Sequence, residues 1–376
     1  MGFMLYATHA IIDLQQLGAN VSAVRSKIGD RALLVPVKAN GYGHGAVEVS
    51  RYLQDNRLAD HLAIANTPEA LELREAGITL PILRLSPAFP EELSALSDAN
   101  VSITIVDEDG VRQAAEVGFR APVHIALDTG MHRIGVDPSG ALDLATKAQQ
   151  AGLNIEGLFT HLPVSDVEDG REFTVAQLKA FNSAATLIQQ NRRDAGLPPI
   201  KYVHAANSGA VLGHDLSGIN MVRPGIIIYG YYPDPASSKN LDIKPVLTWK
   251  TKVSALRKIG PGETVGYGRT WCSDTDRWIA TVPVGYADGY SRLLSNHGRM
   301  LSGGFSYPIA GRVCMDQTML DLGDCENSPL KVGDEVILLG RDGDEQITAD
   351  ELADAMGTIN YEVLCLIAKR VPRVYR

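Results

Sequence analysis

The stretch LLVPVKANGYGHG (residues 33–45) joins a short apolar run to a lysine and then to three glycines within five residues. A brief run of aliphatic and β-branched residues that ends near glycine is typical of a buried strand. Burying an unpaired ammonium is costly, so Lys38 at the end of such a strand needs a physical reason. Either its side chain reaches past the strand end to water, or the fold holds it there for chemistry.

Seven further runs of this kind follow along the chain, and helix-like stretches separate them. The runs are HLAIAN (61–66), PILRLS (81–86), SITIVD (102–107), VHIALDTG (123–130), GLFTHL (157–162), YVHAANS (202–208) and MVRPGIIIYG (221–230). One intervening stretch, TPEALELREAG, has Thr67 as its predicted cap and Gly77 as its predicted stop. Eight apolar strands that alternate with helices predict an α/β fold, an N-terminal (β/α)₈ TIM-type barrel over residues 1–235. A doubly wound open sheet is the structural alternative.

The pattern changes after the Pro- and Ser-rich segment YYPDPASSKN (231–240). The following segments, such as RWIATVPVG and RVCMDQTMLDL, alternate apolar and polar residues, are separated by glycine-containing turns and have few helices between them. This pattern predicts a mostly β C-terminal domain over residues 236–376. One helix is expected in ITADELADAMG, with Thr348 and Glu351 as a capping box and Gly357 as its stop.

Composition excludes several classes of function. The net charge of −9 argues against a nucleic-acid partner, which requires a basic face. No apolar run reaches the roughly 18 residues of a membrane span. The four cysteines (Cys272, Cys314, Cys325 and Cys365) show no paired metal-ligand spacing and are sparse for a disulfide scaffold. We therefore expect a reduced, cytoplasmic protein without a metal.

The position of Lys38 at the C-terminal mouth of the first predicted barrel strand suggests a chemical role. A desolvated lysine can attack a carbonyl through its neutral amine and form a Schiff base. Pyridoxal phosphate is the common partner for this reaction, and it also needs a phosphate cradle. The motifs HAANSGA (204–210) and RPGIIIYG (223–230) end the seventh and eighth predicted strands, where barrel phosphate sites are frequently built.

Nine motifs occur in an order that resembles the alanine racemase family. They are VPVKANGYGHG, DTGMHRIG, THL, HAANSGA, MVRPGIIIYG, VGYGRTW, VGYADGY, RVCMDQTMLDL and TINYEV, and they run from Lys38 to Tyr361. The resemblance implies an isomerase with a pyridoxal-phosphate-binding barrel and a C-terminal β domain. It also implies a homodimer with shared active sites that interconverts L-alanine and D-alanine, supplying D-alanine for peptidoglycan.

The same resemblance implies roles for single residues. Lys38 would hold pyridoxal phosphate and act as the base on the D-face of alanine, and Tyr267 of the neighbouring subunit would be the opposite base. Arg223 would face the pyridine nitrogen, and His161 would orient that arginine. Arg133 would hold the substrate carboxylate and the cofactor's phenolic oxygen, and Met315 of the neighbouring subunit would offer its N–H to the same carboxylate. The residues expected to hold the phosphate are Tyr42, Ser208, Gly225, Ile226 and Tyr361, with Asn207 close by.

Plainer interpretations exist for several of these residues. Tyr267 could be a tyrosine half buried between strands, and His161 could be a strand-end histidine. A departure from the family occurs at Ala126, where many relatives carry a lysine carbamylated by CO₂ that braces the arginine. An alanine carries no charge, so we expect a substitute anion beside Arg133, either chloride or a carboxylate from elsewhere in the barrel.

Three other functions compete with alanine racemisation. A racemase for serine or for a broader set of amino acids is the nearest, although Tyr361 favours a small side chain by resemblance. A non-catalytic pyridoxal-phosphate-binding protein would resemble the first domain alone, whereas the motifs with Tyr267 and Met315 lie in the second. An amino-acid decarboxylase of the same fold type would carry a glycine-run phosphate motif and a C-terminal catalytic cysteine, neither of which is found.

Overall fold

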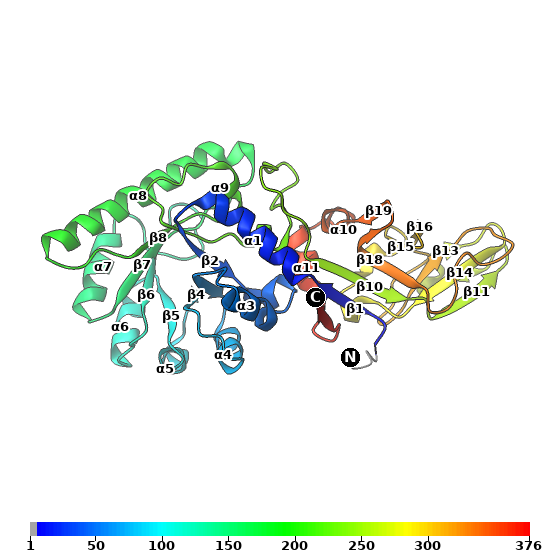
Figure 1. Cartoon of the computed structure of the whole chain (residues 1–376), viewed down its shortest axis with the longest axis horizontal. Coiled ribbons are helices and arrows are strands. Elements are labelled where there is room, and N and C mark those ends of the chain that lie inside the picture. The colour runs from blue at the N-terminus through cyan, green and yellow to red at the C-terminus, as the bar shows by residue number, and fades with distance from the viewer. Residues whose placement is uncertain (1–5) are drawn as a thin grey trace. The chain divides into compact units, whose positions relative to one another are not determined.

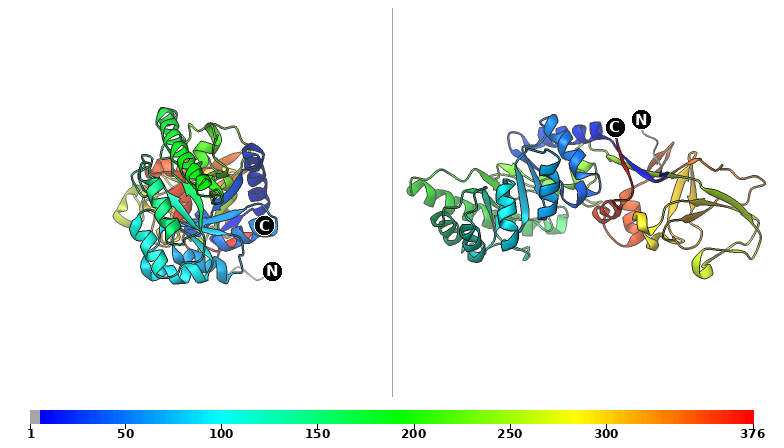
Figure 2. Two further views of the ribbon diagram at one scale, coloured as in Figure 1. Left: turned by 90° about the vertical axis from the view of Figure 1, so that its left-hand side faces the viewer. Right: turned by 90° about the horizontal axis from the view of Figure 1, so that it is seen from below.

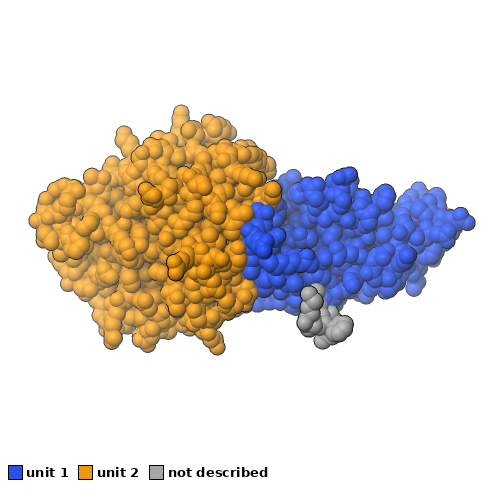
Figure 3. Space-filling model, in the orientation of Figure 1, with its two compact units in different colours: residues 1–16, 42–45, 245–376 blue, residues 17–41, 46–244 orange. Residues whose placement is uncertain are grey.

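The computed structural model describes residues 6–376, which divide into two compact units (Figure 3). The barrel unit consists of residues 17–41 and 46–244. The β unit consists of residues 42–45, residues 245–376 and the described residues up to Gln16. The sequence predicted one boundary between the two domains, at residue 235. In the structure the β unit also contains two short segments from the N-terminal part of the chain.

Eight parallel strands close into a barrel in sequence order (Figure 1). Their register is parallel throughout, as in the pairing of Val35 with Leu62, and β9 pairs back with β2 to close the barrel. This closure confirms the predicted (β/α)₈ barrel and excludes the open sheet. The strands are β2 (Ala32–Pro36), β3 (His61–Ile64), β4 (Ile82–Pro87), β5 (Val101–Ile105), β6 (Val123–Ala126), β7 (Ile155–Phe159), β8 (Tyr202–His204) and β9 (Met221–Val222).

Helices surround these strands in all the ribbon views (Figures 1 and 2). The longest, α8, buries Leu178, Phe181, Ala185 and Ile188, whose spacing of three or four residues places them on one face. The helices that follow the chain through this unit are α1 (Leu14–Ile28), α3 (Ala46–Asp55), α4 (Thr67–Glu75), α5 (Pro90–Asp98), α6 (Glu108–Glu116), α7 (Ala141–Gln150), α8 (Arg171–Asp194) and α9 (Ser208–Gly213).

Two local predictions in the barrel unit are wrong. Asn66, not Thr67, caps α4: its extended backbone lets its side chain accept the N–H of Glu69 at 3.0 Å. The run that begins at Met221 is a strand for only two residues. After Pro224, which has no N–H to donate to a sheet, residues Ile226–Tyr229 form the 3₁₀ turn η2 and are fully buried.

The β unit is mostly strand, as predicted. One sheet has the order β16-β15-β18-β10-β1-β20, with β19 paired to β18, and a second has the order β11-β14-β17. Within it, Thr348 caps α10 by accepting the N–H of Glu351, and Gly357 ends the helix with a φ of 70°. The carboxylate of Glu351 bonds Arg299 rather than completing a capping box. The elements are β1 (His9–Ile12), β10 (Leu247–Lys252), β11 (Ala255–Ile259), β12 (Thr264–Val265), β13 (Trp271–Cys272), β14 (Arg277–Val282), β15 (Arg299–Ser302), β16 (Phe305–Pro308), β17 (Thr318–Asp321), β18 (Glu335–Asp342), β19 (Glu345–Ile347), α10 (Ala349–Met356), α11 (Asn360–Leu366) and β20 (Arg373–Tyr375).

Over residues 6–376, none of the helices is long and apolar enough to cross a membrane. Cys272, Cys314 and Cys325 are free thiols in this structure.

Candidate active site

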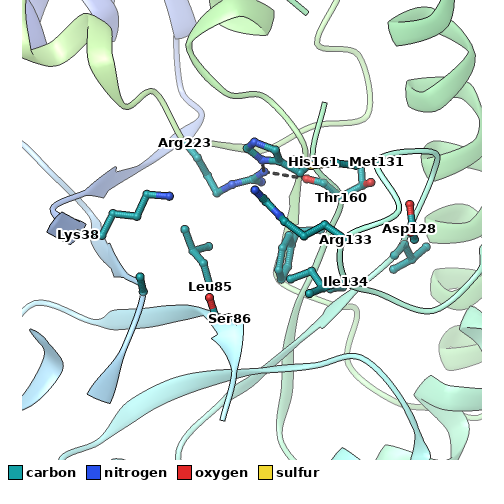
Figure 4. Close-up of a pocket in the computed structure, with 14 residues that line it drawn as sticks. Lys38, Leu85, Ser86, Asp128, Met131, Arg133, Ile134, Thr160, His161 and Arg223 are labelled. Atoms are coloured by element: carbon teal, nitrogen blue, oxygen red, sulfur yellow. Dashed lines mark hydrogen bonds between the residues drawn. The ribbon is translucent and has the colours of Figure 1, made fainter. Parts of the chain in front are cut away.

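A cavity of about 260 Å³ opens at the C-terminal mouth of the barrel. Its wall is made by the ends of the strands and the residues that follow them, where catalytic groups gather in this fold. Figure 4 shows the ammonium of Lys38 and the guanidinium groups of Arg133 and Arg223 directed into this space. The lining residues are Lys38, Ala65, Leu85, Ser86, Ala126, Leu127, Asp128, Met131, Arg133, Ile134, Phe159, Thr160, His161 and Arg223.

Lys38 begins a left-handed turn directly after β2. Ala39, Asn40, Gly41 and Tyr42 all have φ between 52° and 62°, a region that costs a non-glycine residue roughly 1–2 kcal/mol. Hydrogen bonds hold the turn: the N–H of Gly41 donates to the carbonyl of Val37 at 2.7 Å, and the N–H of Ala39 donates to Glu69 at 2.7 Å. The fold thus maintains a strained backbone next to the lysine, a feature that clusters at functional sites.

Two of the glycines after Lys38, Gly43 and Gly45, allow close packing of the backbone. A Cβ at Gly43 would stand 2.1 Å from the carbonyl oxygen of Leu364, and one at Gly45 would stand 1.8 Å from the hydroxyl of Tyr375. Both glycines also have positive φ. They therefore permit close packing against the C-terminal segment of the same chain within the β unit.

Arg223, directly after β9, is 4% exposed and held by four acceptors. Its Nη1 donates to Nδ1 of His204 at 2.8 Å. Its Nη2 donates to the carbonyl oxygens of Thr160 at 2.7 Å and Ala205 at 3.3 Å, and lies 3.3 Å from Nδ1 of His161 (Figure 4). Burial and then the nearby charge of Arg133 lower the pKa of Arg223 to about 9, which leaves it protonated at pH 7.

His161 lies beside this arginine, as the sequence prediction requires. Burial lowers its pKa, and the positive charges of Arg223, Arg133 and Lys38 lower it further, to about 3. A neutral imidazole at physiological pH can accept a hydrogen bond through Nδ1. The geometry is therefore compatible with His161 as an acceptor that helps orient Arg223.

Arg133 lines the cavity from the loop after β6, and Ala126 lines it from the end of that strand. Within residues 6–376, no hydrogen bond or ion pair joins the guanidinium of Arg133 to another side chain. The acidic residue in the cavity wall, Asp128, instead accepts the backbone N–H groups of Gly130 and His132. An internal carboxylate as the substitute anion is thus not what this structure provides.

Four of the residues predicted at the phosphate site lie in the barrel unit: Asn207, Ser208, Gly225 and Ile226. Asn207 caps α9, accepting the N–H of Ala210 at 3.1 Å, and its amide donates to the carbonyl of Leu162 at 2.8 Å. The hydroxyl of Ser208, the first residue of α9, accepts the N–H of Gly225 at 3.0 Å. Ile226 follows at the start of η2. The loops after β8 and β9 therefore converge, as the barrel phosphate-site pattern predicts.

The remaining predicted residues belong to the β unit. Tyr267 is 72% exposed in the short 3₁₀ turn η3 (Tyr267–Arg269), which excludes the half-buried interpretation. Met315 is 53% exposed, and its N–H makes no hydrogen bond within the described chain. The rings of Tyr42 and Tyr361 are tilted against each other with centroids 6.0 Å apart.

Sequence reasoning missed His204 as a partner of Arg223, together with the carbonyl groups of Thr160 and Ala205. His204 stands in the quoted run YVHAANS, and a histidine inside an otherwise apolar strand was an available signal. The carbonyl partners could not be found from residue types, because every residue has a carbonyl group.

The donor set suits pyridoxal phosphate. Three cationic groups, Lys38, Arg133 and Arg223, face one cavity whose wall contains a single carboxylate, that of Asp128. Such a site favours an anionic ligand. Beside this cavity-lining set, Ser208 supplies a hydroxyl and Ile226 a backbone N–H, groups of the kind that bind phosphate, and the N–H of Gly225 holds the Ser208 hydroxyl in place.

A (β/α)₈ barrel with a lysine and two arginines in its C-terminal mouth defines a class of barrel enzymes that bind an anionic ligand beside an amine. The family model described as "Alanine racemase, N-terminal domain" matches residues 12–233, and that described as "Alanine racemase, C-terminal domain" matches residues 246–375. The chain therefore belongs to the alanine racemase family of isomerases.

Individual relatives agree over the whole chain. A curated alanine racemase of Cutibacterium acnes is 49% identical over 373 residues, covering 98% of this chain and 97% of that protein. The solved alanine racemase of Clostridium difficile 630 has a TM-score of 0.91 and 35% identity, covering 100% of this chain and 97% of that one. The alanine racemase of Bacillus anthracis, solved with bound L-Ala-P, has a TM-score of 0.89 and 35% identity, with coverage of 100% and 96%.

Proposed function

We propose that this chain interconverts L-alanine and D-alanine with pyridoxal phosphate, using Lys38 and Tyr267 as two opposed bases. The observation that carries the proposal is the single cavity that receives the side chains of Lys38, Arg133 and Arg223 at the barrel mouth. Membership of the alanine racemase family across both domains supports it.

Pyridoxal phosphate, when bound, withdraws electrons from the α-carbon of an attached amino acid and so makes its α-proton acidic. Lys38 would hold the cofactor's carbonyl carbon. Ser208, Gly225, Ile226, Tyr42 and Tyr361 would hold its phosphate, with Asn207 fixing the start of α9. Arg223 would face the ring nitrogen as a hydrogen-bond donor.

Racemisation needs proton transfer on both faces of the α-carbon, because one base removes the proton and another returns it from behind. Lys38 Nζ would exchange the proton on the D-face, and Tyr267 Oη would exchange it on the L-face. A phenol accepts protons poorly at neutral pH, so nearby positive charge is required. Arg312 is a cation close to this turn, since a Cβ at Gly268, the residue after Tyr267, would stand 3.3 Å from its Nε.

The substrate carboxylate would bind the guanidinium of Arg133 and the N–H of Met315. Both groups have donors that the described chain leaves unpaired, which supports an anionic ligand at each. Arg223, which keeps its proton at pH 7, would donate to the ring nitrogen and leave that nitrogen unprotonated. The weaker electron withdrawal would favour return of the proton to the α-carbon over side reactions.

The proposal includes a homodimer with shared sites, and the exposure of two β-unit residues supports it. Tyr267 and Met315 are exposed in the single chain, and large exposed apolar side chains mark interaction surfaces when they gather. Each would serve the barrel of the partner chain. The cytoplasmic location and the supply of D-alanine for peptidoglycan are likewise part of this proposal.

Chiral chromatography of the product from L-alanine, L-serine and L-lysine, tested separately, checks the proposal. Conversion of L-alanine to the racemic mixture, with little conversion of the others, is expected. Conversion of L-serine at an equal rate would instead indicate a racemase of broader amino-acid specificity. A protein that binds pyridoxal phosphate and racemises none of the three would instead be a cofactor-binding protein.

A further inference from the structure

A line of buried hydrogen-bonding groups runs through the barrel interior away from the cavity. It starts at Arg223, whose Nη1 lies 2.8 Å from Nδ1 of His204. Nε2 of His204 lies 2.8 Å from Nδ1 of His124 on β6. Nε2 of His124 lies 3.7 Å from Oε2 of Glu156, near the N-terminal end of β7. The line therefore connects a cation in the site with a carboxylate toward the other end of the barrel.

The protonation of each ring in this line follows from the arginine. A guanidinium only donates, so Nδ1 of His204 must be an acceptor without a proton. His204 therefore carries its proton on Nε2 and donates it to Nδ1 of His124. His124 in turn must carry its proton on Nε2, which points toward Glu156. Each ring is neutral, and all the N–H bonds point from Arg223 toward the carboxylate.

Burial keeps both rings neutral. His204 is 0% exposed and His124 is 1% exposed. Burial is the main cause that lowers the pKa of each below its ordinary value, and the charge of Arg223 acts in the same direction. The other titratable groups around the pair are His61, Glu156 and Lys201, and the ring of His124 stacks on that of Tyr202.

The backbone of β7 is shaped to admit the His124 ring. A Cβ at Gly157 would stand 2.1 Å from Nδ1 of His124 and 2.4 Å from its Cε1. Residues 124 and 157 are register partners on neighbouring strands. Only glycine at this position leaves room for the ring to reach His204, so this contact depends on a specific residue of the neighbouring strand.

Glu156 is the acceptor available to the last N–H of this line, that of His124 Nε2. Nε2 of His124 makes no hydrogen bond shorter than 3.5 Å within the described chain, and the Glu156 carboxylate is the acidic group next to it. A buried N–H without an acceptor is costly, so a nearby carboxylate favours the tautomer with the proton on Nε2. The N–H of His124 in turn lowers the pKa of Glu156, which stays charged at pH 7.

We propose that Glu156 and His124 are positioning residues that act through His204 to hold Arg223 in its donor orientation toward the cofactor. The opposite tautomers would place an N–H of His204 against an N–H of Arg223 and displace the guanidinium. This inference rests on the proposed function only in assigning the cofactor ring to Arg223. The line of hydrogen bonds itself does not depend on the reaction.

The first test needs no variant. In NMR of the holoenzyme labelled with [¹⁵N]histidine, the resonances of His124 and His204, assigned by single substitutions, should each show a proton on Nε2 and a bare Nδ1. Protonation of Nδ1 in either ring, or a charged ring near pH 7, would overturn the proposal.

Substitutions at Glu156 then test whether the effect reaches the cofactor. Glu156→Gln keeps an acceptor and should retain the tautomers, whereas Glu156→Leu removes it and should alter the Nδ1 resonance of His204. In the leucine variant we expect cofactor affinity, measured by absorbance titration, and kcat each to fall on the order of tenfold, the effect of losing one hydrogen bond to a charged group. KM for alanine should change by less than about twofold, because the substrate carboxylate lies elsewhere.

Lys201→Gln is the matched control, because Lys201 lies 3.7 Å from the other Glu156 oxygen but is outside the line. It should leave the His204 resonance and cofactor affinity unchanged. If a folded Glu156→Leu protein kept the wild-type His204 resonance and the wild-type cofactor affinity, the proposal would be contradicted. Equal effects of Glu156→Leu and Lys201→Gln on these two quantities would also contradict it. Failure to racemise alanine would reject the proposed function and leave the tautomer test intact.

Discussion

Replacing Glu92 with glutamine should destabilise the barrel by about 3 kcal/mol at neutral pH. Glu92 on α5 forms an ion pair with Arg84 on β4 at 2.8 Å, and the arginine side chain is only 5% exposed. The residues that follow Arg84, Leu85 and Ser86, form part of the cavity wall. The substitution leaves a buried guanidinium without its counter-charge, a change that is strongly destabilising.

The magnitude follows from the pKa of Glu92. Burial by itself would raise that pKa, but hydrogen bonds from Arg84, the Phe89 N–H and Thr67 outweigh it and lower the pKa from 4.5 to about 2. This difference corresponds to about 3 kcal/mol of stability. Because the pKa in the folded state is the lower one, the contribution is fully present above about pH 4.5 and is lost as the pH falls through about 2.

Urea unfolding followed by far-UV circular dichroism measures this difference in the barrel, whose helices dominate the signal. Tryptophan fluorescence does not serve, since Trp249, Trp271 and Trp278 all belong to the β unit. The difference in unfolding free energy between wild type and variant should stay constant from pH 7 to about 4.5 and narrow as the pH falls from there toward 3. Glu116→Gln, which breaks an exposed pair with Arg112, should cost less than about 1 kcal/mol. A gap below 1 kcal/mol, or one independent of pH, would refute the reasoning.

Three further predictions concern the site. Lys38→Ala should abolish both the absorbance of the bound cofactor and racemisation; a cofactor adduct that borohydride can still reduce would show that another lysine holds it. Exchanging chloride for a larger anion at constant ionic strength should weaken substrate binding, because a unit anion about 4 Å from Arg133 supplies on the order of 4 kcal/mol of attraction at an effective dielectric of about 20. Ala126→Lys in bicarbonate should reduce that sensitivity, and kinetics that are unchanged across anions would exclude the chloride site. Mixed Lys38→Ala and Tyr267→Phe chains should regain activity, since a heterodimer contains one intact site; no recovery after confirmed subunit exchange would contradict shared sites.

The barrel could be predicted because each strand is a continuous apolar run between helical segments, a local pattern that the sequence displays directly. The position of Lys38 followed from the same pattern, since residues just after parallel strands gather at one barrel mouth, whereas His161 and Arg223 were assigned to the site by the resemblance to the family. Side-chain contacts that form only when the barrel closes could not be predicted from the sequence. The contact between His124 and His204 joins strands 80 residues apart and requires the register and the glycine on the strand between them.

Local errors have similar causes. Thr67 fits the N-cap pattern, but its hydroxyl accepts a hydrogen bond from Arg84 and donates one to Glu92. Both partners are distant in sequence. Glu351 fits the capping box, but Arg299 takes its carboxylate. In both cases a tertiary partner with a full charge competes successfully with a local backbone partner. Short-range patterns locate the helix ends to within a residue and cannot foresee such partners.

The central claim is that Lys38 and Tyr267 act on opposite faces of the α-carbon. Exchange of the α-proton for deuterium, measured separately from L-alanine and D-alanine with the Tyr267→Phe protein, tests it most directly. The account predicts that exchange from L-alanine is crippled while exchange from D-alanine is partly retained, although net racemisation falls in both directions. Equal loss of exchange from the two antipodes would contradict the one-sided role of Tyr267.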